Sequence, residues 1–190
     1  MKRCRNIKII DITRDLNENI KIYEGDPPFT LEKFYSVENN GFAIAHLSMG
    51  THSGTHIDAP SHVIPEGRGV KEIPLSDLVG ECIVVDRNSM KVPAGIKRVI
   101  VKGGEEKNGR ITESQARKLV DAGVRLVGTD SLSLGSDEVH KILLGEGCAI
   151  LEYLDLKKAE TGIYMLCAMP LKIAADGSPV RACLIQGVCE

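Results

Sequence analysis

Short apolar runs bounded by polar or glycine-rich segments recur along the 190-residue chain. Runs of this kind that are rich in β-branched residues are typical of strands. The pair Asn40-Gly41 predicts a hairpin, and the polar turn 174–179 predicts a second one near the C-terminus. The pattern therefore predicts strands at 7–12, 20–23, 29–37, 41–49, 82–85, 99–101, 124–128, 148–154, 163–173 and 180–188.

Two segments have helical periodicity instead. Thr112 and Gln115 have the spacing of a capping box, and the apolar residues that follow keep the helical period up to Gly123. A shorter helix is expected from Ser136 to Gly145, and Ser76 is expected to cap a single helical turn. Residues 98–128 then form a strand-helix-strand unit with a right-handed crossover, which indicates one mixed α/β domain over 1–190.

Composition narrows the class of partner. The net charge is −2 and charged residues make up 26% of the chain, so the composition lacks the basic excess typical of nucleic-acid-binding proteins. A small molecule is the expected partner. No apolar run approaches the roughly 20 residues that a membrane-spanning helix needs. The basic start 1–5 precedes an apolar run that Lys8 and Asp11 interrupt, unlike a signal peptide, so a cytoplasmic protein is expected.

The cysteines are scattered and include no Cys-x-x-Cys pair of the kind found in thiolate zinc sites and redox motifs. Most of them lie in apolar, strand-like surroundings. We therefore expect reduced thiols that act as small core residues. The six are Cys4, Cys82, Cys148, Cys167, Cys183 and Cys189.

The stretch 52–62 holds three of the chain's five histidines and one carboxylate. Gly54 and Pro60 argue against a helix there. In a straight strand His52 and His56 would lie about 13 Å apart, near the limit for two imidazoles that share a metal. We therefore predict that the stretch is the end of a strand that bends at Gly54 into a loop.

Imidazole and carboxylate together suit Zn²⁺, Mn²⁺ or Fe²⁺, and the absence of nearby thiolates disfavours a purely structural zinc site. A lone histidine is usually structural, and His46 is interpreted as a core or edge residue. The density of 52–62 predicts a metal site. Glu152, between two apolar residues, would be costly to bury unpartnered, and a metal shared with His140 would supply the partner. Equally, Glu152 could face solvent while His140 caps a helix end.

Two further segments are candidates to contact a substrate. Tyr23 begins a turn that contains Gly25 and two prolines, and it is either a substrate contact or a residue at the edge of the core. Residues 63–75 are rich in proline, glycine and charge, and we expect a loop that crosses the site and forms a wall of the pocket.

Residues in three parts of the chain resemble a known family. Residues 52–62 match, at every fixed position, the His-x-Gly-Thr-His-x-Asp-x-Pro-x-His signature of the cyclase-like metal-dependent hydrolases, which include bacterial kynurenine formamidases and isatin hydrolases. Residues 25–27 resemble the early Gly-Asp-Pro turn of that family. His140 and Glu152 resemble its downstream metal pair.

The resemblance implies a role for each matching residue. His52, His56 and Asp58 would bind one metal ion, and Asp58 would bridge to a second. The second ion would also be held by His140, and Glu152 would complete the site by touching both ions. The resemblance makes His62 the proton donor and acceptor, and Tyr23 stands where the family has a substrate-contacting aromatic, commonly Trp. Thr55 is a candidate to orient a ligand. The cofactors would be two divalent ions, zinc first and manganese as the alternative.

The resemblance, together with the chemistry of these residues, implies a metal-dependent amidohydrolase, similar to an arylformamidase, that cleaves an amide, formamide or cyclic amide with metal-activated water. The alternative is a ligand-binding protein that kept the metal and lost turnover, against which His62 argues because it is not needed to hold metal. A third reading, incidental histidines, predicts no stoichiometric metal. By resemblance, the fold is an α/β domain of the swivelling β/β/α type in a homodimer or homotetramer.

Overall fold

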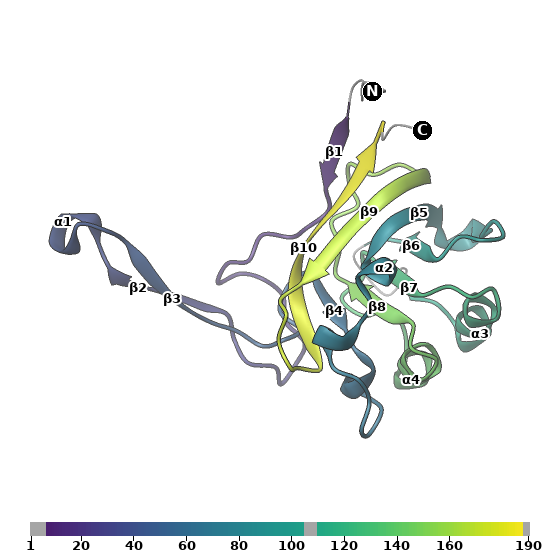
Figure 1. Ribbon diagram of the computed structural model, residues 1–190, viewed down its shortest axis with the longest axis horizontal. Helices are drawn as coiled ribbons and strands as arrows, with labels where there is room; N and C mark the ends of the chain where they lie inside the picture. The colour runs from purple at the N-terminus through teal and green to yellow at the C-terminus, as the bar shows by residue number, and fades with distance from the viewer. Residues whose placement is uncertain (1–6, 105–109, 188–190) are drawn as a thin grey trace.

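A computed structural model describes residues 7–104 and 110–187 (Figure 1). Within them, strands close into a barrel in the order β10-β4-β8-β7-β6-β5-β9, because β9 pairs again with β10. Strand β1 pairs with the far end of β10. The strands are β1 Lys8–Asp11, β2 Thr30–Tyr35, β3 Ile44–Ser48, β4 His56–Asp58, β5 Val79–Asp86, β6 Arg98–Lys102, β7 Leu126–Thr129, β8 Ala149–Glu152, β9 Gly162–Pro170 and β10 Gly177–Gln186.

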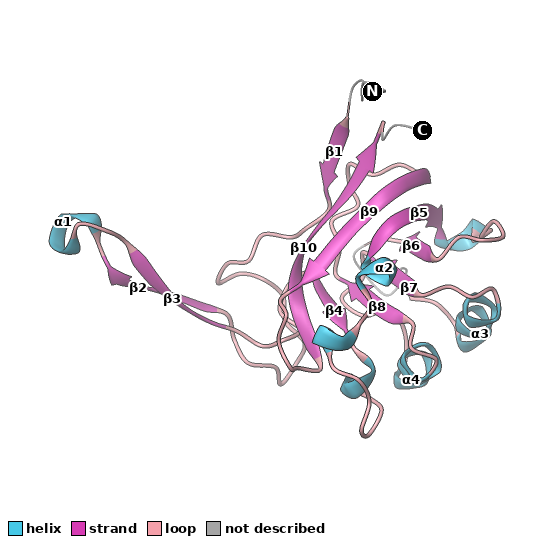
Figure 2. Cartoon of the chain, in the orientation of Figure 1, coloured by secondary structure: helices cyan, strands magenta, loops and turns pink. Residues whose placement is uncertain are grey.

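Helices α3 and α4 lie beside the parallel part of the barrel, whereas α1 lies at the tip of the projecting arm (Figure 2). Strands β5 to β8 are parallel neighbours, and α3 and α4 connect β6 to β7 and β7 to β8. The predicted strand-helix-strand unit is therefore confirmed, and so are the Thr112–Gln115 capping box and the Ser136 cap. The helices are α1 Val37–Asn40, α2 Leu75–Leu78, α3 Glu113–Asp121 and α4 Asp137–Gly145, with the short 3₁₀ helices η1 Pro60–His62, η2 Val70–Glu72 and η3 Arg87–Ser89.

Two apolar cores result from the alternation of side chains along the strands. Ile57 of β4 and Leu151 of β8 join the cluster that fills the barrel. Ile150 joins a second cluster, formed with buried residues of α3 and α4. Because successive strand residues point to opposite faces, His56, Asp58 and Glu152 point out of the barrel, on the side of α4. The two cores thus leave a row of polar residues between the barrel and a helix.

Strands β2 and β3 form a separate two-stranded sheet that projects from the barrel as an arm (Figure 1). The predicted hairpin is confirmed, but the predicted Asn40-Gly41 turn is wrong in detail. The helical turn α1 joins the strands, capped by the hydroxyl of Ser36 and ended by Gly41 in the left-handed conformation. Ser36 provides a local cap that an Asn-Gly turn does not need, so the chain adds a helical turn.

Three other local predictions differ from the structure. Residues 20–23 form no strand, because no neighbouring strand pairs with them. The turn α2 follows Pro74 and is not capped by Ser76. Residues 63–75 contain η2 and are therefore more ordered than a simple loop. None of the helices in 7–104 and 110–187 is long and apolar enough to span a membrane.

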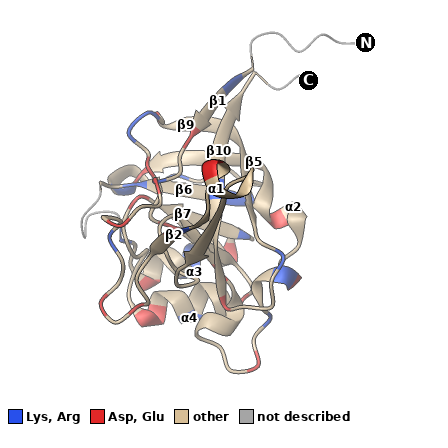
Figure 3. Cartoon of the chain, turned by 90° about the vertical axis from the view of Figure 1, so that its left-hand side faces the viewer, with Lys and Arg blue, Asp and Glu red and all other residues tan. Residues whose placement is uncertain are grey.

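The four described cysteines are free thiols. Cys82 and Cys148 are buried, and burial raises the pKa of each thiol to about 12, as expected for core residues. Cys167 and Cys183 are half-buried and face each other across β9 and β10. Cys4 and Cys189 lie outside the described residues. Basic and acidic residues are interspersed over the face seen in Figure 3.

Candidate metal centre

The histidine-rich stretch folds as a tight turn followed by a short strand. Gly54 has φ +64°, the left-handed conformation that glycine adopts most easily, so the predicted bend is confirmed. The bend brings the ring centroids of His52 and His56 to 5.0 Å. The stretch does not end a strand as predicted, since β3 ends at Ser48 and β4 begins only at His56.

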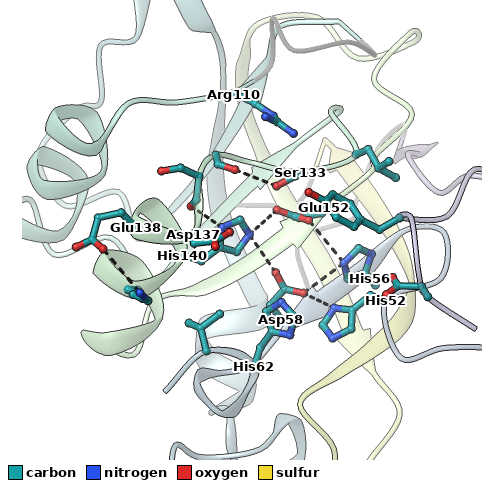
Figure 4. Close-up of a pocket in the computed structure, with 17 residues that line it drawn as sticks. His52, His56, Asp58, His62, Arg110, Ser133, Asp137, Glu138, His140 and Glu152 are labelled. Carbon is teal, nitrogen blue, oxygen red and sulfur yellow. Dashed lines mark hydrogen bonds and ion pairs between the residues drawn. The ribbon is translucent and has the colours of Figure 1, made fainter. Parts of the chain in front are cut away.

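Pairing of distant strands brings the downstream residues to this stretch. His56 lies opposite Glu152 in the antiparallel pair β4 and β8. From the neighbouring α4, His140 places its Nε2 3.1 Å from Oε1 of Glu152. All five predicted metal ligands therefore meet, although they come from a turn, two strands and a helix (Figure 4).

Asp58 lies between two groups of candidate ligands. Its Oδ1 is 2.8 Å from Nδ1 of His52 and 3.3 Å from Nε2 of His56. Its Oδ2 is 3.8 Å from Nε2 of His140. Ligand atoms of His52, His56 and Asp58 lie within 4.8 Å of one another, and so do those of Asp58, His140 and Glu152. The geometry thus offers two adjacent positions that share one carboxylate.

Hydrogen bonds behind the rings decide which nitrogen faces the site. Nδ1 of His56 is 2.8 Å from the carbonyl oxygen of Gly54, and Nδ1 of His140 is 3.0 Å from that of Ser136. A carbonyl only accepts, so each Nδ1 carries a hydrogen, and each Nε2 can present a lone pair to the site once its own proton has been lost. This is the usual arrangement for histidines that bind metal, and the donor set therefore fits divalent ions.

The charges of the cluster shift the pKa values of its members. Burial alone would lower the pKa of His52, but hydrogen bonds to Asp58 and Asp176 outweigh it and raise the pKa to about 9. Burial is likewise outweighed at His140, where the hydrogen bond to Glu152 raises the pKa to about 9. Burial opposes ionisation of Asp58, yet hydrogen bonds from the two histidines hold its pKa well below the usual range. A metal ion must displace such protons to bind.

Glu152 is buried, so the alternative prediction that it faces solvent is wrong. Its Oε1 accepts the backbone N–H of Leu134 at 2.6 Å as well as the contact with His140. The next residue, Tyr153, has φ 58°, which is strained for a tyrosine. Thr55 donates to the Tyr153 carbonyl at 2.8 Å. Thr55 therefore fixes the backbone beside Glu152.

The candidate ligands line a cavity of about 630 Å³. His62 also lines it, with its ring centroid 4.1 Å from that of His52 and a side chain that is 33% exposed. Tyr23 lines the cavity and is 57% exposed, so it is not a residue of the core. Val63 extends the wall from the predicted 63–75 segment.

Several polar residues at the site were not identified from the sequence. Arg110, Asp137 and Glu138 line the cavity, the last two from the first turn of α4, where acidic residues are explained by the helix dipole alone (Figure 4). Asp176 contacts His52, although it precedes β10 in a turn whose composition signals only a hairpin. His46 is exposed on β3, opposite Glu32, so it belongs to the arm and not to the core.

Known proteins resemble this chain over nearly its whole length. The family described as putative cyclase matches residues 10–116. Kynurenine formamidase of Bacillus mycoides (strain KBAB4) is 33% identical, over 91% of this chain and 95% of that protein. A solved structure of a potential metal-dependent hydrolase with cyclase activity superposes with TM-score 0.81 at 28% identity, over 97% of this chain and 100% of the other.

An isatin hydrolase bound to the product analogue thioisatinate shares the fold. Its TM-score is 0.80 at 21% identity, over 96% of this chain and 93% of that one. The predicted mixed-sheet, cyclase-like fold is therefore confirmed, with its strands closed into a barrel. The fold and the relatives together show that the chain belongs to the putative cyclase family.

Proposed function

We propose that this chain is a metal-dependent amidohydrolase that cleaves a carbon-nitrogen bond of a small formamide, amide or cyclic amide. The observation that carries the proposal is the pair of adjacent ligand groups that share Asp58 and open into a cavity. The family relatives named as a formamidase and a metal-dependent hydrolase support it.

The donor set suits two divalent ions, zinc first and manganese as the alternative, because it contains imidazole and carboxylate without thiolate. His52, His56 and Asp58 would hold one ion, and Asp58, His140 and Glu152 the other. When bound, such ions lower the pKa of water to about 7 and stabilise negative charge on a carbonyl oxygen.

His62 is the proposed proton carrier. It lies on the cavity wall outside the two groups that share Asp58, and its ligand atoms lie close to those of His52 and Asp176 instead. In hydrolysis, water adds to the carbonyl carbon, the carbon-nitrogen bond breaks and the leaving nitrogen needs a proton. A histidine with one face in the cavity can accept the proton of the water and deliver it to that nitrogen.

Tyr23 is the proposed substrate contact. An aromatic side chain at the edge of the cavity offers a flat apolar surface to an aryl group. Leu132 and Val63 add apolar area to the lining. We therefore favour aryl formamides and aryl-fused cyclic amides as substrates.

The test is a screen of metal-loaded protein against aryl formamides, cyclic amides and matching esters. The proposal predicts turnover that requires Zn²⁺ or Mn²⁺ and is lost in a His62→Ala variant that still binds metal. Stoichiometric metal with tight binding of a panel compound that is never consumed would instead identify a binding protein.

A further inference from the structure

Asp176 lies between two histidines of the site that have different proposed roles, the metal ligand His52 and the proton carrier His62. Its Oδ2 lies 2.9 Å from Nε2 of His52 and 3.4 Å from Nδ1 of His62. Its Oδ1 accepts the hydroxyl hydrogen of Thr51 at 3.1 Å. One carboxylate oxygen therefore contacts a proposed metal ligand and the proposed proton carrier at once.

The backbone fixes this carboxylate in place. The carbonyl of Asp176 accepts the N–H of Ala59 at 2.8 Å, and the next residue, Gly177, pairs with Asp58 across β10 and β4. A Cβ at Gly177 would lie 2.7 Å from Cε1 of His52, so the ring packs directly on this backbone. The turn before β10 and the histidine stretch consequently hold one another in register.

The hydrogen-bond pattern of His52 is the reverse of that of the other two histidines. His56 and His140 direct Nδ1 to backbone carbonyls and present Nε2 to the site. His52 presents Nδ1 to Asp58 and directs Nε2 to Asp176. A carboxylate that accepts the outer N–H of a metal-binding histidine fixes its tautomer and ring orientation.

We propose that Asp176 is a positioning residue that orients His52 toward the metal and holds the ring of His62 at the cavity wall. The inference rests on the proposed function, because it takes His52 as a ligand and His62 as the proton carrier. Asp176 is 41% exposed at its side chain, and both of its oxygens are already engaged by the protein. Ligand atoms of Asp176, His52 and His62 also lie within 4.8 Å of one another, so counting the bound ions in an Asp176 variant distinguishes orientation from coordination.

The first test compares Asp176→Ala and Asp176→Asn with Asp121→Asn, which removes an exposed carboxylate at the end of α3. Titration with Co²⁺ or Zn²⁺ measures affinity and stoichiometry. The alanine variant should bind the same number of ions about 10- to 100-fold more weakly. The asparagine variant keeps an acceptor oxygen and should recover most of the affinity, and the control should match the wild type.

Kinetics provide a second readout. With any substrate from the screen, Asp176→Ala should lower kcat more than it changes KM, because substrate binding does not use this carboxylate. Unchanged affinity and unchanged kcat in the alanine variant would overturn the inference. Loss of one full equivalent of metal would also overturn it, since Asp176 would then be a ligand.

A measurement on the unmutated protein covers the case in which Asp176→Ala fails to fold. Nitrogen-15 NMR of histidine-labelled, zinc-loaded protein should show His52 protonated at Nε2, and His56 and His140 protonated at Nδ1. The same tautomer at all three would contradict the proposed role. If the loaded protein hydrolyses nothing, turnover fails while these binding and NMR results still decide the role of Asp176; a protein that binds no metal overturns both.

Discussion

At single residues of this site, contacts between imidazoles and carboxylates shift pKa values. His52 and His140 each have a pKa raised to about 9 by carboxylate partners, against their burial. Asp176, despite its own burial, has a pKa lowered to about 2 by its hydrogen bond with His52. Each pair stabilises the fold only while the imidazole is protonated and the acid is ionised.

The sign of the pH dependence follows from these directions. The raised histidine pKa values contribute stability that is present below the ordinary value of 6.5 and lost as pH rises to about 9. The lowered Asp176 value contributes stability that is present above 3.8 and lost as pH falls toward 2. Urea unfolding of metal-free protein should therefore show the highest free energy of unfolding between about pH 3.8 and pH 6.5, where both contributions are present. A free energy of unfolding that increases from pH 6.5 to 9 would contradict the pairing.

The role of His62 makes a separate prediction at the same scale. His62→Ala should lower kcat by about 10²- to 10⁴-fold, as expected when a proton carrier is removed. The number of bound metal ions should not change. His46→Ala, which removes the exposed histidine of the arm, is the matched control and should keep wild-type activity. Equal activity of the two variants would exclude His62 as the proton carrier.

The sequence identified some residues of the site better than others. The five candidate ligands and His62 follow from dense spacing and a resemblance with many fixed positions, and the structure brings them together. Asp176 could not be found, because Asp-Gly-Ser-Pro is an ordinary turn composition. Only the pairing of β10 with β4 reveals its position beside the site.

At the scale of secondary structure, two features bring the candidate ligands together. They are the register of β4 with β8 and the left-handed turn at Gly54. Strong local signals such as the Thr112–Gln115 capping box predicted their helix correctly. The turn α1 and the irregular segment 20–23 were missed, because their conformations depend on a cap and on the absence of a pairing strand. Periodicity detects neither feature.

The Gly54 turn yields a prediction about stability and metal binding. A Cβ there would lie 2.6 Å from Cδ2 of Leu16, and the carbonyl of Gly54 holds the ring of His56. Gly54→Ala should therefore destabilise the fold by more than the roughly 1–2 kcal/mol of left-handed strain and weaken metal binding. Gly95→Ala is the matched control, because Gly95 has φ +89° with no atom within 4 Å of its added Cβ. Urea unfolding and metal titration measure both effects, and equal losses in the two variants would contradict the role of the turn.

At the scale of the whole molecule, the arm formed by β2 and β3 exposes apolar side chains that no other part of the described chain covers. Two-stranded hairpins are marginally stable alone, yet this one exposes large apolar residues on both strands. The outer surface of β1 and β9 also exposes apolar side chains, and the arm points away from its own barrel (Figure 1). These exposed residues include Leu31, Phe34, Phe42, Ile44 and Leu47 on the arm and Ile9, Ile163 and Met169 on the barrel.

We propose that a second copy of the chain covers these surfaces, as in the expected homodimer or homotetramer, because a two-fold exchange would bury both apolar surfaces at once. Light scattering coupled to size exclusion should give an oligomer for the wild type. Replacing Phe34 and Phe42 with serine should shift it toward monomer. Leu75→Ser, at an exposed leucine of α2, should not. A wild-type monomer at all concentrations would refute the proposal.

The proposed function requires that the cluster around Asp58 holds metal ions that serve hydrolysis. The most direct measurement is a titration of metal-free protein with Zn²⁺, and in parallel with Mn²⁺, during which hydrolysis of an aryl formamide is followed as released amine. Activity should rise until two ions are bound per chain and disappear when a chelator removes them. Hydrolysis that does not depend on metal, or fully loaded protein with no turnover of any amide in the panel, would contradict the account.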